Sequence, residues 1–318
     1  MTTFSLGQKW ASMITESDAP DVPIIGANLS PQPSAEEFNL FLVELARSDT
    51  AREMARRKWI SPVTSSLKDR ITERSSALFE FFSDMRSPGL AHAMFKGRRA
   101  SARRPLMDEI ATTAWIAYVT SVAGSQQNSA PFDATRIDDA FVQHLASLSS
   151  LDDGPKRALD AVQSIGIHVV IESGLPGMSV DGVSLHDEHV GPVLAMTLRH
   201  DRLDNFWFTL LHEIGHICLH LRHPGDAVFV DSEDEENEGS EVEAEANAFA
   251  KDGLIPRDVW LRSDAHRRGD EASVLDLARK LGIHPAIVAG RLRFERRDYR
   301  MFPDLIGIGQ VRSLIFGD

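Results

Sequence analysis

The sequence lacks the features of membrane proteins and of disulfide-stabilised secreted proteins. Among its 318 residues there is one cysteine, Cys218, so no internal disulfide can form. No apolar run approaches the ~20 residues that a membrane-spanning helix needs. The first residues lack the basic start and apolar stretch of a secretory signal. We therefore expect a cytoplasmic protein with no membrane partner.

An excess of basic residues is also absent. The formal net charge is −13, which argues against nonspecific nucleic-acid binding by the whole chain. Positions 231–245 hold nine acidic and no basic residues, so the rest of the chain has a net charge of only −4. Because positions 231–238 have no apolar residues, we interpret them as a solvated acidic loop.

The N-terminal third has helical patterns and no strand alternation. Apolar residues recur at helical spacing after residue 34, after Ser61-Pro62 and from Pro105 to Val122. Thr50 and Glu53 have the spacing of a capping box. A polar stretch at 124–131 ends in proline and predicts a linker. We expect an all-helical N-terminal domain over 1–130, with a recruiting or sensing role, and a second domain over 131–318.

The second domain mixes helices with short strands. Helices are predicted over 137–148 and 155–165, and strands over 166–172 and 192–198. Residues 180–185 suggest a hairpin arm that turns at Asp181-Gly182. The predicted fold class is α+β, mostly helical, with a small β-sheet.

Residues 205–220 hold the motif around which the chain is organised. His212-Glu213-x-x-His216 is an H-E-x-x-H motif within an otherwise apolar run. On a helix, positions i and i+4 share one face, so two imidazoles can offer nitrogens to one metal ion. Glu213 lies beside them, where a carboxylate can take a proton from water. Buried polar groups need partners, which favours metal binding over chance occurrence of the motif.

A zinc hydrolase also needs a third ligand from elsewhere. The segment 240–250 predicts a helix with three candidate carboxylates, Glu241, Glu243 and Glu245. Spacing alone does not choose between them. Two histidines and a carboxylate would also accept manganese or iron, although zinc is the default metal.

These segments together resemble the ImmA/IrrE family of metallo-endopeptidases, which implies a zincin-like metallopeptidase core around the small sheet. Residues 209–220 carry the H-E-x-x-H motif, residues 243–250 match E-x-x-A-(N/D)-x-F-A, and an apolar segment then ends at Pro256. The resemblance extends over about 150–300 and implies that one zinc ion per chain is held by His212, His216 and Glu243. It also implies that Glu213 is the catalytic base and that Asn247 hydrogen-bonds a ligand histidine.

The group that stabilises the oxyanion is not identified by the resemblance. Five side chains are candidates: Tyr118, Tyr299, His200, His220 and His266. His220 matches a histidine often found at this family position, although a histidine at a helix end also interacts with the helix dipole. We interpret Cys218 as a small core residue.

Residues 273–293 have a helix-turn-helix-like pattern with Gly282 at the turn. Between residues 279 and 300 there are seven basic and two acidic residues. DNA contact through 273–300 is therefore an alternative to a structural or protein-docking role. Structure or docking is the favoured interpretation.

The leading hypothesis is a zinc-dependent endopeptidase of narrow specificity. The resemblance implies that it cleaves a helix-turn-helix repressor or antitoxin in a stress, phage or toxin–antitoxin regulatory system. The alternative is a DNA-binding transcriptional regulator or antitoxin-like protein whose metal site is structural or vestigial. A third hypothesis is an interaction protein whose acidic loop mimics DNA.

Overall fold

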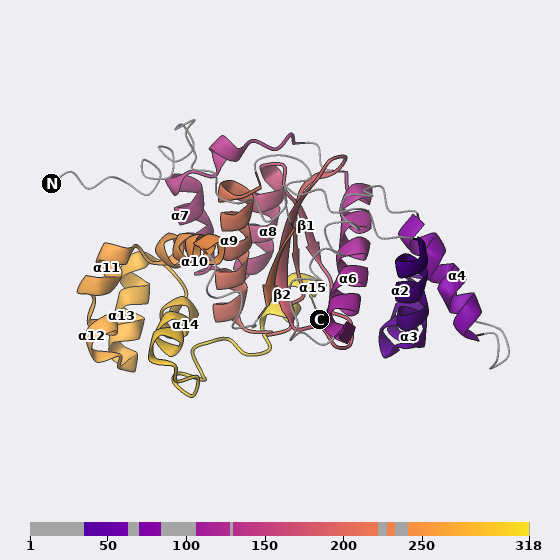
Figure 1. The fold of residues 1–318 in the computed structure, drawn as a ribbon. Coiled ribbons are helices and arrows are strands. Elements are labelled where there is room, and N and C mark those ends of the chain that lie inside the picture. Colours follow the sequence, from indigo (N-terminus) through magenta and orange to yellow (C-terminus); the bar gives the residue numbers. More distant parts are fainter. Residues whose placement is uncertain are drawn as a thin grey trace.

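The computed structural model describes residues 35–62, 70–83, 106–127, 130–221, 228–232 and 241–317. Within these ranges the chain is mostly helical, with one small sheet near the middle of the molecule (Figure 1). The predicted α+β class with a small sheet is confirmed. No described helix combines the length and the apolar character needed to cross a membrane.

The described sheet has four strands in the order β1-β3-β2-β4. Strands β1 and β3 pair in parallel, whereas β2 pairs with β3 and β4 in antiparallel fashion. Their bounds are β1 His168–Ile171, β2 Val180–Asp187, β3 Gly191–Met196 and β4 Val228–Ser232.

Both faces of the sheet are buried, because its apolar side chains alternate between two cores. Val169 and Leu194 face the core that surrounds the H-E-x-x-H helix. Their neighbours Val170 and Val193 face a second core on the opposite side.

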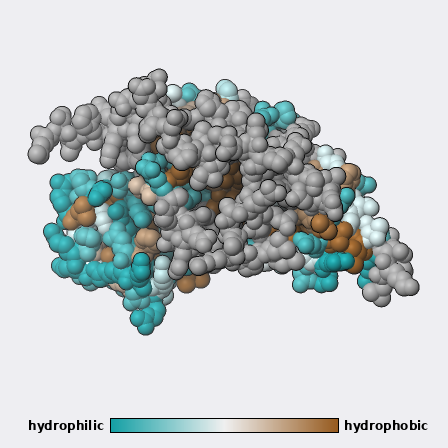
Figure 2. Space-filling view, viewed as in Figure 1, coloured by the Kyte–Doolittle hydropathy of each residue, from teal (hydrophilic) through white to brown (hydrophobic). Residues whose placement is uncertain are grey.

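Helices that follow residue 133 cover the first face. The H-E-x-x-H helix α9 packs on β2 and β3, and α10 packs on α9 (Figure 1). Short helices after α10 form a lobe with a mainly hydrophilic surface in Figure 2. The elements are η1 Ala134–Arg136, α7 Asp139–Leu148, α8 Gly154–Ser164, α9 Leu203–Leu219, α10 Glu241–Leu254, α11 Arg257–Arg262, α12 Asp264–Arg268, α13 Glu271–Leu281, α14 Pro285–Arg296 and α15 Val311–Phe316.

Helices of the N-terminal third cover the second face. They are α2 Ala35–Arg47, α3 Asp49–Arg56, α4 Arg70–Ser83 and α6 Leu106–Ser125. Trp115 of α6 is fully buried in the same core as Val170 and Val193. Helices α2 to α4 lie on the side of α6 that faces away from the sheet (Figure 1). The N-terminal helices therefore share a core with the sheet, and the division at 130/131 stays a prediction.

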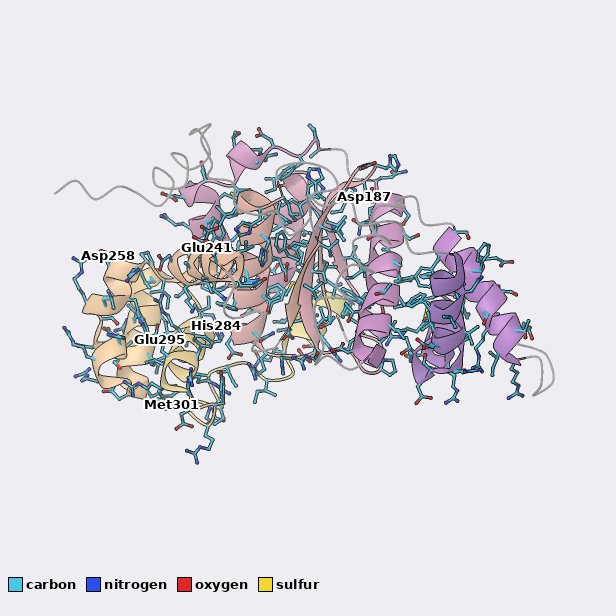
Figure 3. The ribbon with its side chains drawn as sticks, in the orientation of Figure 1. Asp187, Glu241, Asp258, His284, Glu295 and Met301 are labelled. Atoms are coloured by element: carbon cyan, nitrogen blue, oxygen red, sulfur yellow. The ribbon has the colours of Figure 1, made fainter. Side chains whose placement is uncertain are left out.

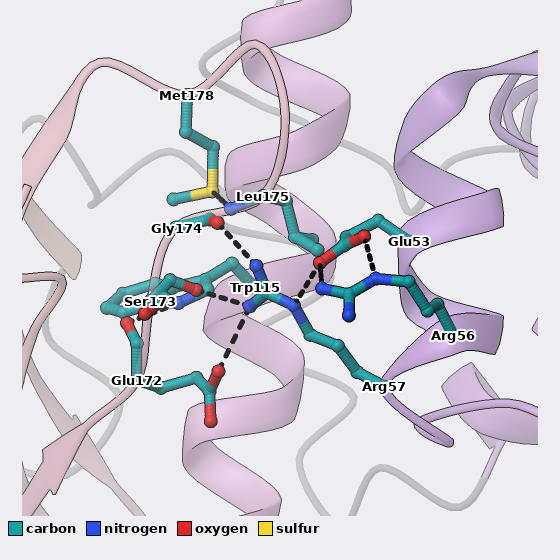
Figure 4. A network of polar contacts seen from close by, with 9 residues as sticks. All are labelled: Glu53, Arg56, Arg57, Trp115, Glu172, Ser173, Gly174, Leu175 and Met178. Atoms are coloured by element: carbon teal, nitrogen blue, oxygen red, sulfur yellow. Dashed lines mark hydrogen bonds and ion pairs between the residues drawn. The ribbon is translucent and has the colours of Figure 1, made fainter.

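Polar contacts fasten these helices to the loop after β1 (Figure 4). The Arg57 guanidinium donates to the carbonyl oxygens of Ser173 and Gly174 at 2.6 and 2.9 Å. It also lies 3.0 Å from the Glu172 carboxylate, and the Trp115 indole N–H donates to the Glu172 carbonyl oxygen at 3.1 Å. Because Arg57 is largely buried, these contacts fix α3 against the sheet.

The hairpin predicted to turn at Asp181-Gly182 is wrong. Strand β2 continues through both residues, and the turn to β3 lies at 188–190. A different constraint explains why position 182 is a glycine. A Cβ added there would lie 2.2 Å from a carboxylate oxygen of Glu213. Glycine inside a strand here marks a close approach of α9.

Two other boundaries also differ from the sequence predictions. Asp231, predicted in the acidic loop, pairs with Gly182 as part of β4, whereas 233–240 lie outside the described residues. Helix α3 is capped by Ser48, whose hydroxyl accepts from the Ala51 amide, so the Thr50 capping box is wrong. Ser48 comes first in the chain and already has the extended backbone that a cap requires.

The polar stretch predicted as a linker begins inside a helix. Helix α6 continues to Ser125, and the Gln126 side chain donates to the Val169 carbonyl oxygen at 2.9 Å. Residues 128–129 lie outside the described part of the chain, as do residues 63–69, where the helix predicted after Ser61-Pro62 would begin.

The helix-turn-helix-like pair consists of α13 and α14, with Gly282 in the left-handed conformation between them. Half of the residues of α14 are buried against the protein, including Ile287 and Arg293. Arg293 donates to the Met301 carbonyl oxygen at 3.3 Å, and Arg291 lies over the Trp260 ring. Both arginines therefore stabilise this lobe, in which Figure 3 labels Met301.

Candidate metal centre

Helix α9 carries the H-E-x-x-H motif through the centre of the protein. Its apolar residues face the core nearly all round, which is why the segment is helical and buried. The motif is enclosed with it: His212 is 2% exposed, and Glu213 and His216 are 0% exposed. Three polar side chains in such a place need specific partners.

The two histidines turn toward one another and toward Glu243. Their Nε2 atoms lie 2.9 Å apart. The Glu243 carboxylate oxygens lie 3.3 Å from His212 Nε2 and 3.4 Å from His216 Nε2. All three candidate ligand atoms are within 4.8 Å of one another, so the three side chains could hold one metal ion.

Close packing of α10 on α9 brings Glu243 to this position. Gly215 lies against α10, where an added Cβ would be 3.3 Å from the Ala246 Cα atom. Of the three glutamates predicted on this helix, only Glu243 is part of the cluster. Glu241 is exposed at the start of α10 (Figure 3), whereas Glu245 contacts His220.

Strand β2 holds the Glu213 carboxylate. The Ser184 hydroxyl contacts Oε2 of Glu213 and lies 3.0 Å from its main-chain carbonyl oxygen. Gly182, two residues earlier on the same face of the strand, leaves room for Oε1. Sequence reasoning missed both residues, since a serine and a glycine in a short strand carry no signal of their own.

Aromatic and polar contacts hold the His216 ring on the sides that do not face His212 and Glu243. The ring of Phe229 on β4 stacks on the His216 ring, with centroids 4.5 Å apart and planes at 9°. Nδ1 of His216 lies 3.1 Å from Nδ1 of His220, and Nε2 of His220 lies 2.9 Å from Glu245 Oε2. Phe229 was also missed, because β4 was not predicted.

Burial and mutual contact set the charges in the cluster. Burial lowers the pKa of His216 to about 4, although contact with Glu243 opposes this shift. Burial alone would raise the pKa of Glu243, but its contacts with His212 and His216 outweigh burial and lower it to about 2. At neutral pH the cluster thus contains a neutral His216 imidazole and an ionised Glu243, the forms that bind metal ions.

These pKa values predict that the metal-free protein is sensitive to acid. Between pH 6.5 and 4 the unfolded chain takes up a proton that folded His216 does not, so the free energy of unfolding falls as pH falls. For His216 the loss is on the order of 3 kcal/mol. Glu243 extends the fall from pH 4.5 toward 2.

Urea unfolding of EDTA-treated protein at a series of pH values measures this effect. His168, His220 and His284 also have pKa values lowered by burial, so they add to the slope. A His216→Asn variant should show a shallower slope between pH 6.5 and 4. Stability that stays constant or rises as the pH falls through this window would contradict the prediction.

A comparison with protein-family models matches residues 162–293 to the peptidase M78 family, described as the IrrE N-terminal-like domain. Residues 162–293 are thus similar to this domain. The resemblance to the ImmA/IrrE family is thereby confirmed for this part of the chain. A comparison with curated proteins gives no significant match.

The region similar to the IrrE N-terminal-like domain contains the whole His212–His216–Glu243 cluster, α13 and α14 up to Arg293, but α2 to α6 lie outside the match. Its family is one of metallopeptidases, which agrees with a cluster able to bind a metal ion. Asn247 lies half-buried on α10, one turn after Glu243, and its hydrogen bond to a histidine stays a prediction.

The oxyanion candidates differ in their surroundings. Tyr118 stacks on Trp59 at a centroid distance of 3.8 Å, on the face of the sheet opposite α9. His266 packs on Trp260, and Tyr299 is exposed. His220 lies next to the cluster, but its nitrogens face His216 and Glu245. His200 is half-buried before the start of α9. The surroundings of these five side chains do not identify an oxyanion donor.

Proposed function

We propose that this protein is a zinc-dependent endopeptidase with one metal ion per chain. The observation that carries the proposal is the convergence of His212, His216 and Glu243 beside a buried Glu213, within an IrrE N-terminal-like domain. Two imidazole nitrogens and a carboxylate are a typical donor set for catalytic zinc. Asn247 is proposed to hydrogen-bond one of the ligand histidines.

When bound, zinc supplies Lewis-acid chemistry, which polarises a peptide carbonyl and makes water more acidic. Glu213 is the proposed general base. Its carboxylate accepts a proton from the attacking water and delivers it to the amine that leaves when the peptide bond breaks. The Ser184 hydroxyl contacts this carboxylate and Gly182 leaves room for it, so that the carboxylate is positioned against β2 before the reaction begins.

The proposed substrate is a helix-turn-helix repressor or antitoxin in the cytoplasm. Family resemblance supports this choice, and β4 provides a physical route for binding. It is the last strand of the described sheet and carries Phe229, which stacks on His216. An extended peptide that pairs with such an edge would have its main chain next to the cluster.

DNA binding is the less favoured role. In α14 the central residues are buried against the protein, and Arg291 and Arg293 donate hydrogen bonds within it. On α13, Arg279 and Lys280 pair with Asp276. These contacts favour a structural role for 273–293.

Comparison of new protein N-termini in cells that express the wild type or Glu213→Gln tests the substrate proposal. The expected result is a small set of cleavages present only with the wild type, at least one of them in a helix-turn-helix protein. The purified, zinc-loaded enzyme should reproduce that cleavage. The absence of any cleavage that depends on Glu213 would overturn the proposed activity.

A further inference from the structure

We propose that His220 and Glu245 are positioning residues that hold His216 in the tautomer required for metal binding. This proposal rests on the proposed function of His216 as a metal ligand. A hydrogen-bonded chain runs from Glu245 Oε2 to His220 Nε2 at 2.9 Å, and from His220 Nδ1 to His216 Nδ1 at 3.1 Å. It ends at His216 Nε2, which faces His212 and Glu243.

The donor and the acceptor in each of these hydrogen bonds follow from the Glu245 carboxylate. A carboxylate only accepts hydrogen bonds, so the Nε2–H group of His220 donates a hydrogen bond to Glu245. In a neutral His220 ring Nδ1 then accepts, and the proton between the two rings belongs to Nδ1 of His216. Nε2 of His216 therefore presents its lone pair to the cluster.

The opposite tautomer of His216 can also form a hydrogen bond, to Glu243. Contacts that select the correct tautomer therefore matter for metal binding. With its proton on Nε2, His216 would donate to Glu243, 3.4 Å away, and no lone pair would face the cluster. Nδ1 of His216 would then oppose the lone pair of His220 Nδ1 at 3.1 Å. Because His220 is only 10% exposed, water does not readily relieve that contact.

Packing holds these hydrogen-bonded side chains in position. The His220 ring centroid lies 5.2 Å from that of His216 and 5.5 Å from that of Phe229. Glu245 reaches His220 from α10, two residues after Glu243, so a single helix contributes a carboxylate to each end of the chain. Partners of this kind behind a ligand histidine typically change metal affinity by 10- to 100-fold.

Zinc affinity of the full-length protein, measured by competition with a chromophoric chelator, tests the proposal. His220→Phe keeps a ring in the same packing but removes both nitrogens, and should weaken zinc binding by about 10- to 100-fold. His220→Asn places a carbonyl oxygen near the former Nδ1, and should restore most of the affinity. Glu245→Gln should weaken binding by about 10-fold, because an amide N–H can favour the opposite tautomer.

Glu241→Gln is the matched control, since it makes the same change on the same helix at an exposed position and should leave zinc affinity unchanged. Unfolding of the metal-free variants by heat separates lost affinity from lost folding. In ¹⁵N NMR spectra of the folded, metal-free wild type, His216 should carry its proton on Nδ1 and His220 on Nε2.

The outcomes distinguish this inference from the function on which it rests. Equal zinc affinity of the wild type and a folded His220→Phe variant would overturn the positioning role but leave the metal site intact. A His216 proton on Nε2 in the folded, metal-free protein would overturn it as well. A wild type that binds no zinc would overturn the proposed function and this inference together.

Discussion

The Glu213→Gln variant should lose hydrolysis while it keeps its metal. The amide has nearly the same shape as the carboxylate and can still contact Ser184, but it cannot accept a proton from water. Loss of a general base typically lowers the rate by 10²- to 10⁴-fold. The measurement is single-turnover cleavage of a substrate by zinc-loaded protein, with the zinc content of each preparation measured in parallel.

Glu241→Gln is the control for this experiment too, because it removes an exposed carboxylate of the same chemistry from α10. It should cleave at the wild-type rate. A Glu213→Gln protein that retains both zinc and activity would show that another group accepts the proton. A variant that loses zinc as well would show that Glu213 helps to hold the metal.

The Trp115→Ala variant should destabilise the whole protein. Trp115 is fully buried between α6 and the sheet, and its N–H donates to the carbonyl oxygen of Glu172. Truncation of a buried tryptophan to alanine lowers the free energy of unfolding by about 3–5 kcal/mol. Trp115→Phe keeps most of the apolar contact and should lose much less, about 1–2 kcal/mol.

Denaturant unfolding followed by circular dichroism measures this loss and also tests how the chain is divided. Because the N-terminal helices and the sheet share a core, we expect one cooperative transition that moves as a whole in Trp115→Ala. Two transitions, with only one shifted by the substitution, would instead support an independent domain over 1–130.

Much of the centre could be predicted from the sequence, since its signals are local. The H-E-x-x-H motif lies at helical spacing in an apolar run, and α9 is the helix it predicts. The strands at 168–171 and 191–196 are short β-branched or apolar segments, as expected of a sheet buried on both faces. Spacing could not choose between Glu241, Glu243 and Glu245, because that choice depends on how α10 crosses α9.

The errors arise where a residue serves a distant part of the chain. Gly182 was interpreted as a turn residue, but its function is to make room for Glu213, thirty-one positions later. Arg291 and Arg293 were counted as charges available to phosphates, although both donate to main-chain carbonyl oxygens of the protein itself. Asp231 was assigned by its charge to a loop, but pairing with β2 places it in a strand.

The most direct test of the account is the zinc content of the purified protein, measured by mass spectrometry beside Glu243→Ala and Glu241→Ala. The account predicts about one zinc ion per chain in the wild type and in Glu241→Ala, and almost none in Glu243→Ala. Both substitutions remove a carboxylate from the first turn of α10, so the comparison isolates the contact with His212 and His216. A wild type that stays metal-free after zinc is supplied, or a Glu243→Ala variant that retains its zinc, would contradict it.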